Sequence, residues 1–147
     1  MFFKKNKNEN ENTNEIKSFI KISALMIHAA RIDQDFSNKE EEIIKQTLEK
    51  IGAKKEYLKK IIEEGKKIEE NSHQILNFTK EVKNMSEANK IKIIEALWQI
   101  IYSNNDADMY ETSLMRRLGG LLYIDSKTMG DIKDKIKKNI HNDLHSK

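Results

Sequence analysis

Two groups of acidic side chains in this chain have a spacing that could hold a metal ion. In each group three carboxylates surround the expected start of a helix, and the second group adds an amide oxygen. Clustered carboxylate and amide oxygens are ligands that suit Ca²⁺ or Mg²⁺. The spacing therefore makes both loops candidate sites for a weakly bound divalent cation. The first group is Asp33, Asp35 and Glu40, and the second is Asn104, Asp106, Asp108 and Glu111.

The same acids have a second interpretation, as caps of the helices that follow them. Carboxylates near a helix start accept hydrogen bonds from free backbone amides and interact favourably with the macrodipole, without any metal. Ser37 and Glu40 have the spacing of a capping box. An EF-hand does not explain the first loop, because Asn38 replaces its sharp-turn glycine and Ile44 replaces its bidentate glutamate. The residues alone leave both interpretations open.

No other group of residues has the pattern of a catalytic site. The chain has no cysteine, which excludes a thiolate zinc site. His28 lies near Asp33 and could join a site there, although a lone histidine beside an apolar stripe is more often simply packed. His141 and His145 have the spacing of a helical zinc pair but lack the glutamate of a metalloprotease motif. We therefore expect a protein that is not an enzyme and has no cofactor other than the cation.

The elements that must position these residues are all expected to be helices. The chain of 147 residues has no proline and 5 glycines, and it is 37% hydrophobic and 35% charged. This composition favours long helices that each bury one face. Apolar residues recur at spacings of three and four in seven segments, and no segment alternates long enough for a strand. The expected helices begin near Thr13, Asn38, Lys54, Ser72, Glu87, Met109 and Ser126.

An internal repeat relates these segments at an offset of 71 residues. Ser37 and Glu40 match Asp108 and Glu111 at that offset, so the two helix starts coincide. Apolar positions stay in phase on both sides of the loops without a gap. We therefore expect an all-α, seven-helix bundle of two three-helix repeats, joined by the fourth helix and related by a pseudo-twofold axis. The apolar pairs include Ile27 with Trp98, Ile44 with Met115, and Leu58 with Met129.

The two loops and their flanking helices resemble the TerB-like family (tellurite resistance protein B), over about residues 16–136. In that family a helix ends in an Asp-Gly turn before an acidic cap and a glutamate. The second copy is the closer match, with Leu97-Trp98 before the turn and Arg116-Arg117 after it. The chain departs from the pattern at three places. Asp33-Gln34 and Asn104-Asn105 replace the two Asp-Gly turns, and Tyr123 stands where a glycine usually ends the sixth helix.

The resemblance implies a non-enzymatic helical module associated with tellurite or metal stress in bacteria, with acidic loops that bind a divalent cation or a partner. A related helical domain occurs in membrane-anchored co-chaperones. This implies the alternative of a pure protein-interaction domain whose acidic loops act only as helix caps. Other proteins are the expected partners. Nucleic acid is not expected, because 27 Lys and Arg are balanced by 24 Asp and Glu, for a net charge of +3.

The ends of the chain are expected to lie outside the packed domain. We predict a disordered polar leader over residues 1–13, the helical domain over 14–140 and a frayed tail over 141–147. The leader is rich in Lys, Asn and Glu, which bury too little surface to offset the entropy of ordering. No apolar stretch has the length of a secretory signal or a membrane span, so we expect a cytoplasmic protein. Phe2 and Phe3 leave open a peripheral contact with a membrane or a partner.

Overall fold

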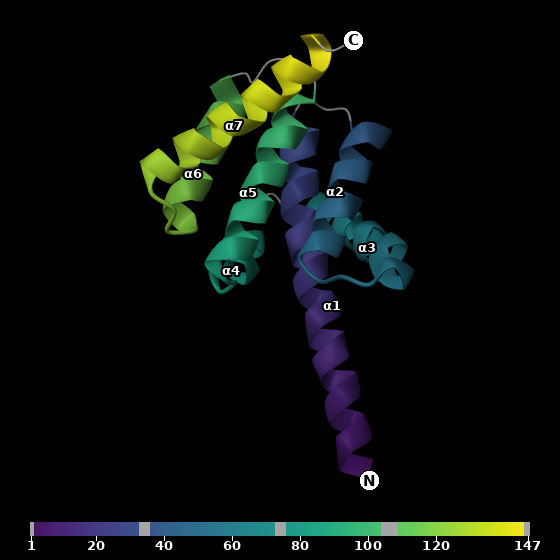
Figure 1. Ribbon diagram of the computed structural model, residues 1–147. Coiled ribbons are helices and arrows are strands. Elements are labelled where there is room, and N and C mark those ends of the chain that lie inside the picture. Colours follow the sequence, from purple (N-terminus) through teal and green to yellow (C-terminus); the bar gives the residue numbers. More distant parts are fainter. Residues whose placement is uncertain (1, 33–35, 73–75, 104–108, 146–147) are drawn as a thin grey trace.

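The computed structural model describes residues 2–32, 36–72, 76–103 and 109–145, and the side chains of 13–32, 36–72, 77–103 and 113–139. These residues form an all-α fold of seven α-helices and one short 3₁₀ helix, η1 (Figure 1). No strand occurs in the described ranges, so the predicted all-α class with seven α-helices is confirmed. The elements are α1 (Phe2–Arg31), α2 (Asn38–Lys50), η1 (Lys55–Tyr57), α3 (Leu58–Asn71), α4 (Leu76–Lys83), α5 (Glu87–Tyr102), α6 (Met109–Leu121) and α7 (Ser126–His145).

Helix α1 begins well before the expected start near Thr13. Its first residue is Phe2, and its N-terminal half extends away from the other six helices (Figure 1). The predicted start was wrong because the apolar stripe marks only the part of a helix that packs. Lys and Glu are good helix formers, and neither glycine nor proline occurs before Gly52 to interrupt the helix. Helix α7 likewise continues to His145, into the segment expected to fray. The domain boundaries near residues 14 and 140 stay predictions.

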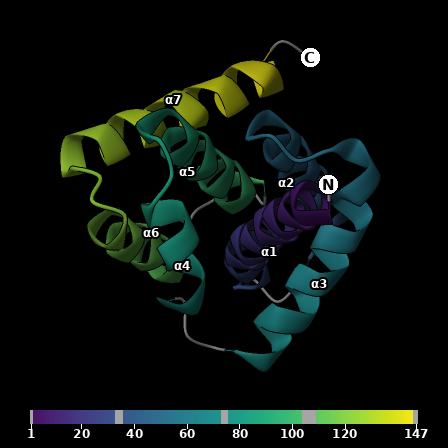
Figure 2. The same ribbon diagram turned by 90° about the horizontal axis from the view of Figure 1, so that it is seen from below.

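The centre of the bundle is α1 together with α5. Helix α1 packs against α2, α3, α4 and α5, and α5 also packs against α7. Viewed along its length, α1 lies in the middle of these neighbours (Figure 2). All six residues from Ile22 to Ile27 are at most 1% exposed, so this part of α1 is buried on every side rather than along one stripe. A helix that is buried all round needs a neighbour on each side, and four helices supply them.

Helices α1 and α3 approach closely where Gly65 faces Ser23. A Cβ atom placed on Gly65 would lie 2.1 Å from Ser23 Oγ and 3.3 Å from both the Ala24 nitrogen and the Ile20 carbonyl oxygen. The Ser23 hydroxyl is fully buried and donates to the Ile20 carbonyl oxygen at 2.7 Å. It also lies 3.3 Å from the carbonyl oxygen of Ile61 in α3. Glycine at position 65 is therefore what lets the two backbones come together.

Two helices end in the same way, at positions 71 residues apart. Gly52 follows α2 with φ 115°, and Tyr123 follows α6 with φ 58°; the described residues contain no other positive φ. A glycine just after the apolar stripe of a helix predicts such a left-handed cap, and the backbone of Gly52 confirms this prediction. Each end closes with the long backbone bond of a Schellman motif. These bonds run from Ala53 N to Leu48 O (2.8 Å) and from Ile124 N to Gly119 O (2.9 Å).

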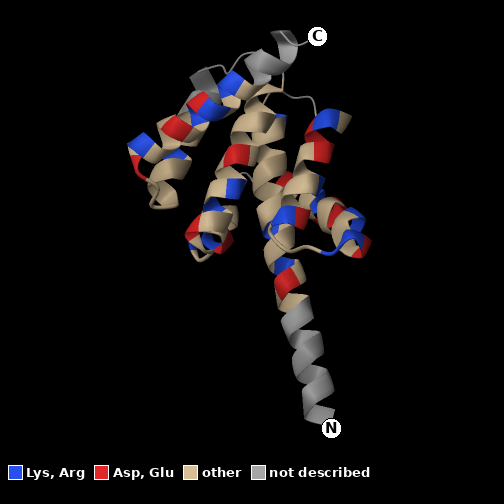
Figure 3. Cartoon of the chain, viewed as in Figure 1, with Lys and Arg blue, Asp and Glu red and all other residues tan. Residues whose placement is uncertain are grey.

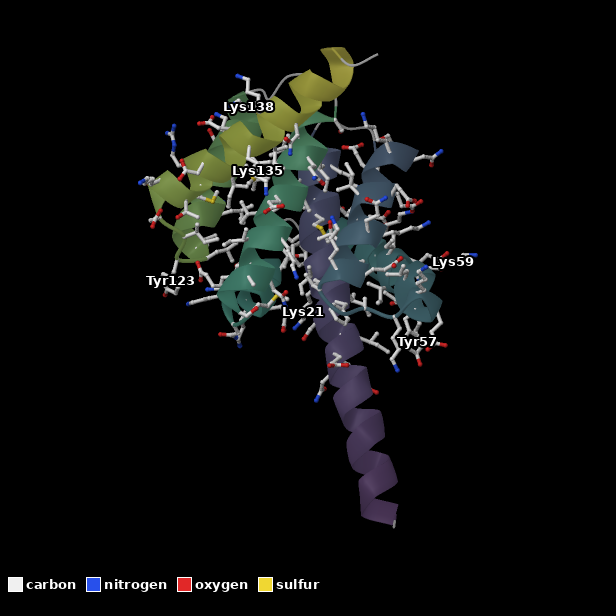
Figure 4. The ribbon with its side chains drawn as sticks, viewed as in Figure 1. Lys21, Tyr57, Lys59, Tyr123, Lys135 and Lys138 are labelled. Atoms are coloured by element: carbon white, nitrogen blue, oxygen red, sulfur yellow. The ribbon has the colours of Figure 1, made fainter. Side chains whose placement is uncertain are left out.

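Tyr123 holds this left-handed conformation without being a glycine, and its side chain is 72% exposed (Figure 4). The Lys83 ammonium at the end of α4 lies 4.7 Å from the centre of its ring. This contact is formed by the side chain, whereas the left-handed backbone carries a steric cost for any residue with a Cβ atom. The two effects can be separated by substitution.

We predict that Tyr123→Gly will be more stable than Tyr123→Ala by about 1 kcal/mol, because both variants lose the ring and only alanine keeps the strained Cβ. Urea unfolding followed by circular dichroism measures the difference. At Gly120, which has an ordinary helical φ, the alanine variant should instead be more stable than the protein with glycine. Equal stability of the two Tyr123 variants would contradict the left-handed cap.

We predict that Gly65→Ala will destabilise the protein by about 1–3 kcal/mol, the usual cost of overpacking a core. The new methyl group must displace Ser23 and press on the backbone of α1. The matched control is Gly120→Ala, because a Cβ atom there meets nothing within 4 Å. The control variant should gain up to about 1 kcal/mol of folding stability, because alanine has a higher helix propensity than glycine. A Gly65→Ala variant as stable as the unmodified protein would show that α1 and α3 are not in close contact.

Candidate functional site

Most of the predicted acidic site lies outside the described residues. This holds for Asp33, Asp35, Asn104, Asp106 and Asp108. Glu111 belongs to α6, but its side chain is not among those described. Only Glu40 can be placed in full. The predicted cation site therefore stays a prediction, and within the described part of the chain no three His, Asp or Glu side chains form a group that could hold a metal ion.

Glu40 is a buried cap of helix α2. Its Oε1 accepts a hydrogen bond from the Ser37 backbone amide at 2.8 Å, and its own amide donates to Ser37 Oγ at 3.2 Å. Together the two bonds form the capping box that the sequence predicted. The residue is 1% exposed. A bound cation would have to share the carboxylate with this cap, so the cap interpretation holds at this position.

The helix ends that flank the two acidic loops lie at the same end of the bundle (Figure 1). Helices α1 and α5 run in the same direction and end there, at Arg31 and Tyr102. Helices α2 and α6 both begin there, at Asn38 and Met109. The described helix ends on both sides of the two acidic segments therefore lie at one end of the molecule.

A buried ion-pair cluster joins the end of α1 to α3, and the sequence reasoning missed it. Glu69 is 7% exposed, and its Oε2 lies 2.6 Å from Arg31 Nη1. His28 Nδ1 lies 3.4 Å from Glu69 Oε1, and Arg31 Nη2 lies 3.3 Å from Glu70 Oε1. His28 is thus packed against a carboxylate of α3. The signal for Glu69 was its position, four residues after Gly65 on the inward stripe of α3.

Charges of both signs are mixed over the described helices (Figure 3). Several acids pair with bases on a neighbouring helix, as Glu81 does with Lys21 at 3.3 Å and Glu95 with Lys135 at 3.6 Å. Asp125, at the start of α7, accepts a hydrogen bond from the Thr128 amide at 2.6 Å, and this bond lowers the pKa of its carboxyl group. None of the described helices is long and apolar enough to cross a membrane.

We predict that Glu69→Gln will cost about 1–3 kcal/mol of folding free energy, the range for losing a charge-assisted hydrogen bond at a largely buried position. Chemical unfolding at neutral pH measures it. The matched control is Glu70→Gln, since the Glu70 side chain is 61% exposed and pairs with the same arginine. An exposed pair is worth at most about 1 kcal/mol. Equal losses in the two variants would contradict the buried pair at Glu69.

One of three comparisons with known proteins identifies a family for this chain. The model of the family described as tellurite resistance protein TerB matches residues 19–134. Neither the search of curated proteins nor the search of solved structures found a match. The matched range begins inside α1 and ends inside α7, so it takes in both acidic loops and every packed helix. The chain therefore belongs to the TerB family.

Proposed function

We propose that this protein is a non-enzymatic binding module of the TerB type, and that its two acidic loops bind a divalent cation at one end of the bundle. The observation that supports the proposal is the arrangement of α1, α2, α5 and α6, whose described ends next to the two acidic segments lie at the same end of the molecule. Two adjacent sets of oxygen donors would attract a hard cation more strongly than either set alone. Without a full EF-hand ligand set, the dissociation constant should be on the order of 10⁻⁴–10⁻³ M.

The proposal includes a role in the response to tellurite or metal stress. Membership of the TerB family supports this role. In this proposal the module acts in the bacterial cytoplasm and transmits the bound or unbound state of its acidic end to partner proteins.

We also propose that the two acidic loops are equivalent parts of a duplicated three-helix unit, with α4 as the connection. The support comes from the offset of 71 residues, which relates the capping motifs in the sequence and also the matching ends of α2 and α6 at Gly52 and Tyr123. In such a duplication, a pseudo-twofold axis would bring the two loops to equivalent positions. A cation site formed by one loop would then have a counterpart in the other.

Glu40 favours a second candidate function, a protein-interaction domain whose acidic loops act only as caps. Its carboxylate is buried and already bonded to the Ser37 amide. If the other acids are used in the same way, the acidic end would be a rigid, charged surface for a protein partner and would need no ion. The two candidates differ in one measurable property, the dependence of stability on divalent cations.

We predict that 10 mM Ca²⁺, Mg²⁺ or Mn²⁺ will stabilise the folded state by about 1.4–2.7 kcal/mol, the linkage expected for a dissociation constant of 10⁻³–10⁻⁴ M. Thermal unfolding with and without EDTA measures the shift, and NMR should place the affected resonances in residues 33–40 and 104–111. The double variant Asp106→Asn with Glu111→Gln should lose much of this shift. The double variant also loses helix caps and is therefore less stable without any metal. For this reason the quantity compared between the variant and the unmodified protein is the increase in stability on adding the cation.

The matched control is the double variant Glu87→Gln with Asp131→Asn. Like the double variant in the acidic loop, it removes the charge of one aspartate and one glutamate. Glu87, like Glu111, lies in the first turn of a helix. Both side chains are exposed. The control therefore reports the effect of two lost surface charges on general screening by the salt, while the residues of the acidic loops are unchanged. This control should retain the full increment. If millimolar cations leave the melting temperature and the loop resonances of the unmodified protein unchanged, the cation proposal is wrong and the interaction domain remains.

A further inference from the structure

A hollow of about 540 Å³ lies between α5, α6 and α7, away from the Glu40 cap. Its wall is largely apolar, and Trp98, Met115, Ile124 and Met129 contribute to it. We refer to it as the α5–α6–α7 pocket. Its volume falls within the range of ligand sites for small molecules, and an apolar wall with a few polar groups at the rim is their usual composition.

Glycines keep this pocket open. Gly120 on α6 and Gly130 on α7 both line it, and a Cβ atom placed on either would meet nothing within 4 Å. Gly119 is different, because its Cβ atom would lie 3.1 Å from Met129 Cγ, so packing explains that glycine. A glycine inside a helix costs about 1 kcal/mol relative to alanine. Packing offers no reason for this cost at positions 120 and 130, and both glycines leave open space beside the pocket.

Trp98 forms the aromatic part of the wall and carries an unused donor. The residue is 3% exposed, and its indole Nε1 is buried without a hydrogen-bond partner. Its ring stacks on Tyr102, with the ring centres 5.8 Å apart. A buried donor without a partner costs about 1–3 kcal/mol.

The rim of the pocket is cationic. Arg116 is exposed on α6, and Lys133 on α7 places its ammonium 5.3 Å from the centre of the Trp98 ring. Neither side chain forms an ion pair with any residue that the structure describes. The acid at the rim is Asp125, and its carboxylate is already bonded to the Thr128 amide as the cap of α7. The Asp125 carboxylate keeps its negative charge, so the two cations leave a net charge of +1 (2 − 1) on the rim to interact with an incoming anion.

We propose that the α5–α6–α7 pocket binds a small amphipathic anion, with its apolar part against Trp98, Met115 and Met129 and its carboxylate between Arg116 and Lys133. A medium-chain fatty acid has this chemistry. The charge on the rim selects against a neutral or cationic ligand with the same apolar part. The described residues that line this pocket include none of the seven predicted cation ligands, and binding is tested without divalent cations, so its failure can be distinguished from failure of the cation proposal.

The test uses the fluorescence of Trp98, the single tryptophan of the chain. Octanoate, octanol and octylammonium share one chain length and differ in charge, and each is added to the full chain at submicellar concentration in EDTA. Octanoate should give a saturable change with a dissociation constant on the order of 10⁻⁴ M, as expected for a ligand of this size. Octanol should bind at least about fivefold more weakly, and octylammonium more weakly still.

Three variants locate the site. Gly130→Leu places a side chain in the open space and should weaken octanoate binding at least about tenfold, while melting no lower than the unmodified protein. Gly120→Leu repeats the test from α6 if the first variant does not fold. Lys133→Ala should lower the affinity for octanoate to that for octanol. The matched control is Lys135→Ala, which removes a lysine of the same helix that pairs with Glu95 and should bind octanoate normally.

Several outcomes would overturn the proposal. The absence of a saturable response to octanoate would show that the pocket takes no such ligand. Equal affinity for octanoate and octanol, or tighter binding of octylammonium, would show that the rim does not select an anion. Unchanged octanoate binding in a folded Gly120→Leu or Gly130→Leu variant would place the ligand elsewhere. Because divalent cations are absent, none of these outcomes depends on the acidic loops.

Discussion

The whole bundle depends on the burial of one stretch of α1 on every side. From Ile22 to Ile27 no side chain reaches solvent, although a typical surface helix buries only one stripe. Five of these residues are apolar, and the exception, Ser23, satisfies its hydroxyl on the Ile20 carbonyl oxygen. Such a segment is stable only when other helices surround it. The close approach at Gly65, and the packing of α2, α4 and α5 around the remaining faces, follow from that requirement.

Because the centre is so apolar, the polar groups that must be partly buried lie toward helix ends. Glu69 meets Arg31 and His28 in the last turn of α1, where positive side chains also interact favourably with the macrodipole. Glu40 is buried at the start of α2, where its carboxylate accepts a hydrogen bond from the free Ser37 backbone amide. Both of these buried carboxylates thus lie near a helix end, while the middle of α1 supplies apolar packing.

Much of this arrangement could be predicted from the sequence, because its signals are local. The spacing of apolar residues identified seven helices, Ser37 and Glu40 identified a cap, and Gly52 identified a left-handed end. The start of α1 could not be found, since no residue before Gly52 interrupts a helix. The burial of Glu69 could not be predicted, because this residue stands among alternating Lys and Glu, which is typical of a solvated helix face, and only the position of α1 makes it buried. The α5–α6–α7 pocket depends on the angle between two helices, which no local pattern encodes. The acidic site is less well determined, because Glu40 alone among its seven residues has a described side chain.

The burial of α1 on all sides also has a consequence for biosynthesis. When the chain emerges from the ribosome, α1, α2 and α3 appear first, and they can cover only two sides of the central helix. The sides that face α4 and α5 stay exposed until residues 76–102 have been made. The first half of the chain is therefore a poor folding unit by itself, and a fragment that ends after α3 would present an apolar surface to chaperones or to other nascent chains. If the two halves did arise by duplication, neither has kept the independence of its ancestor.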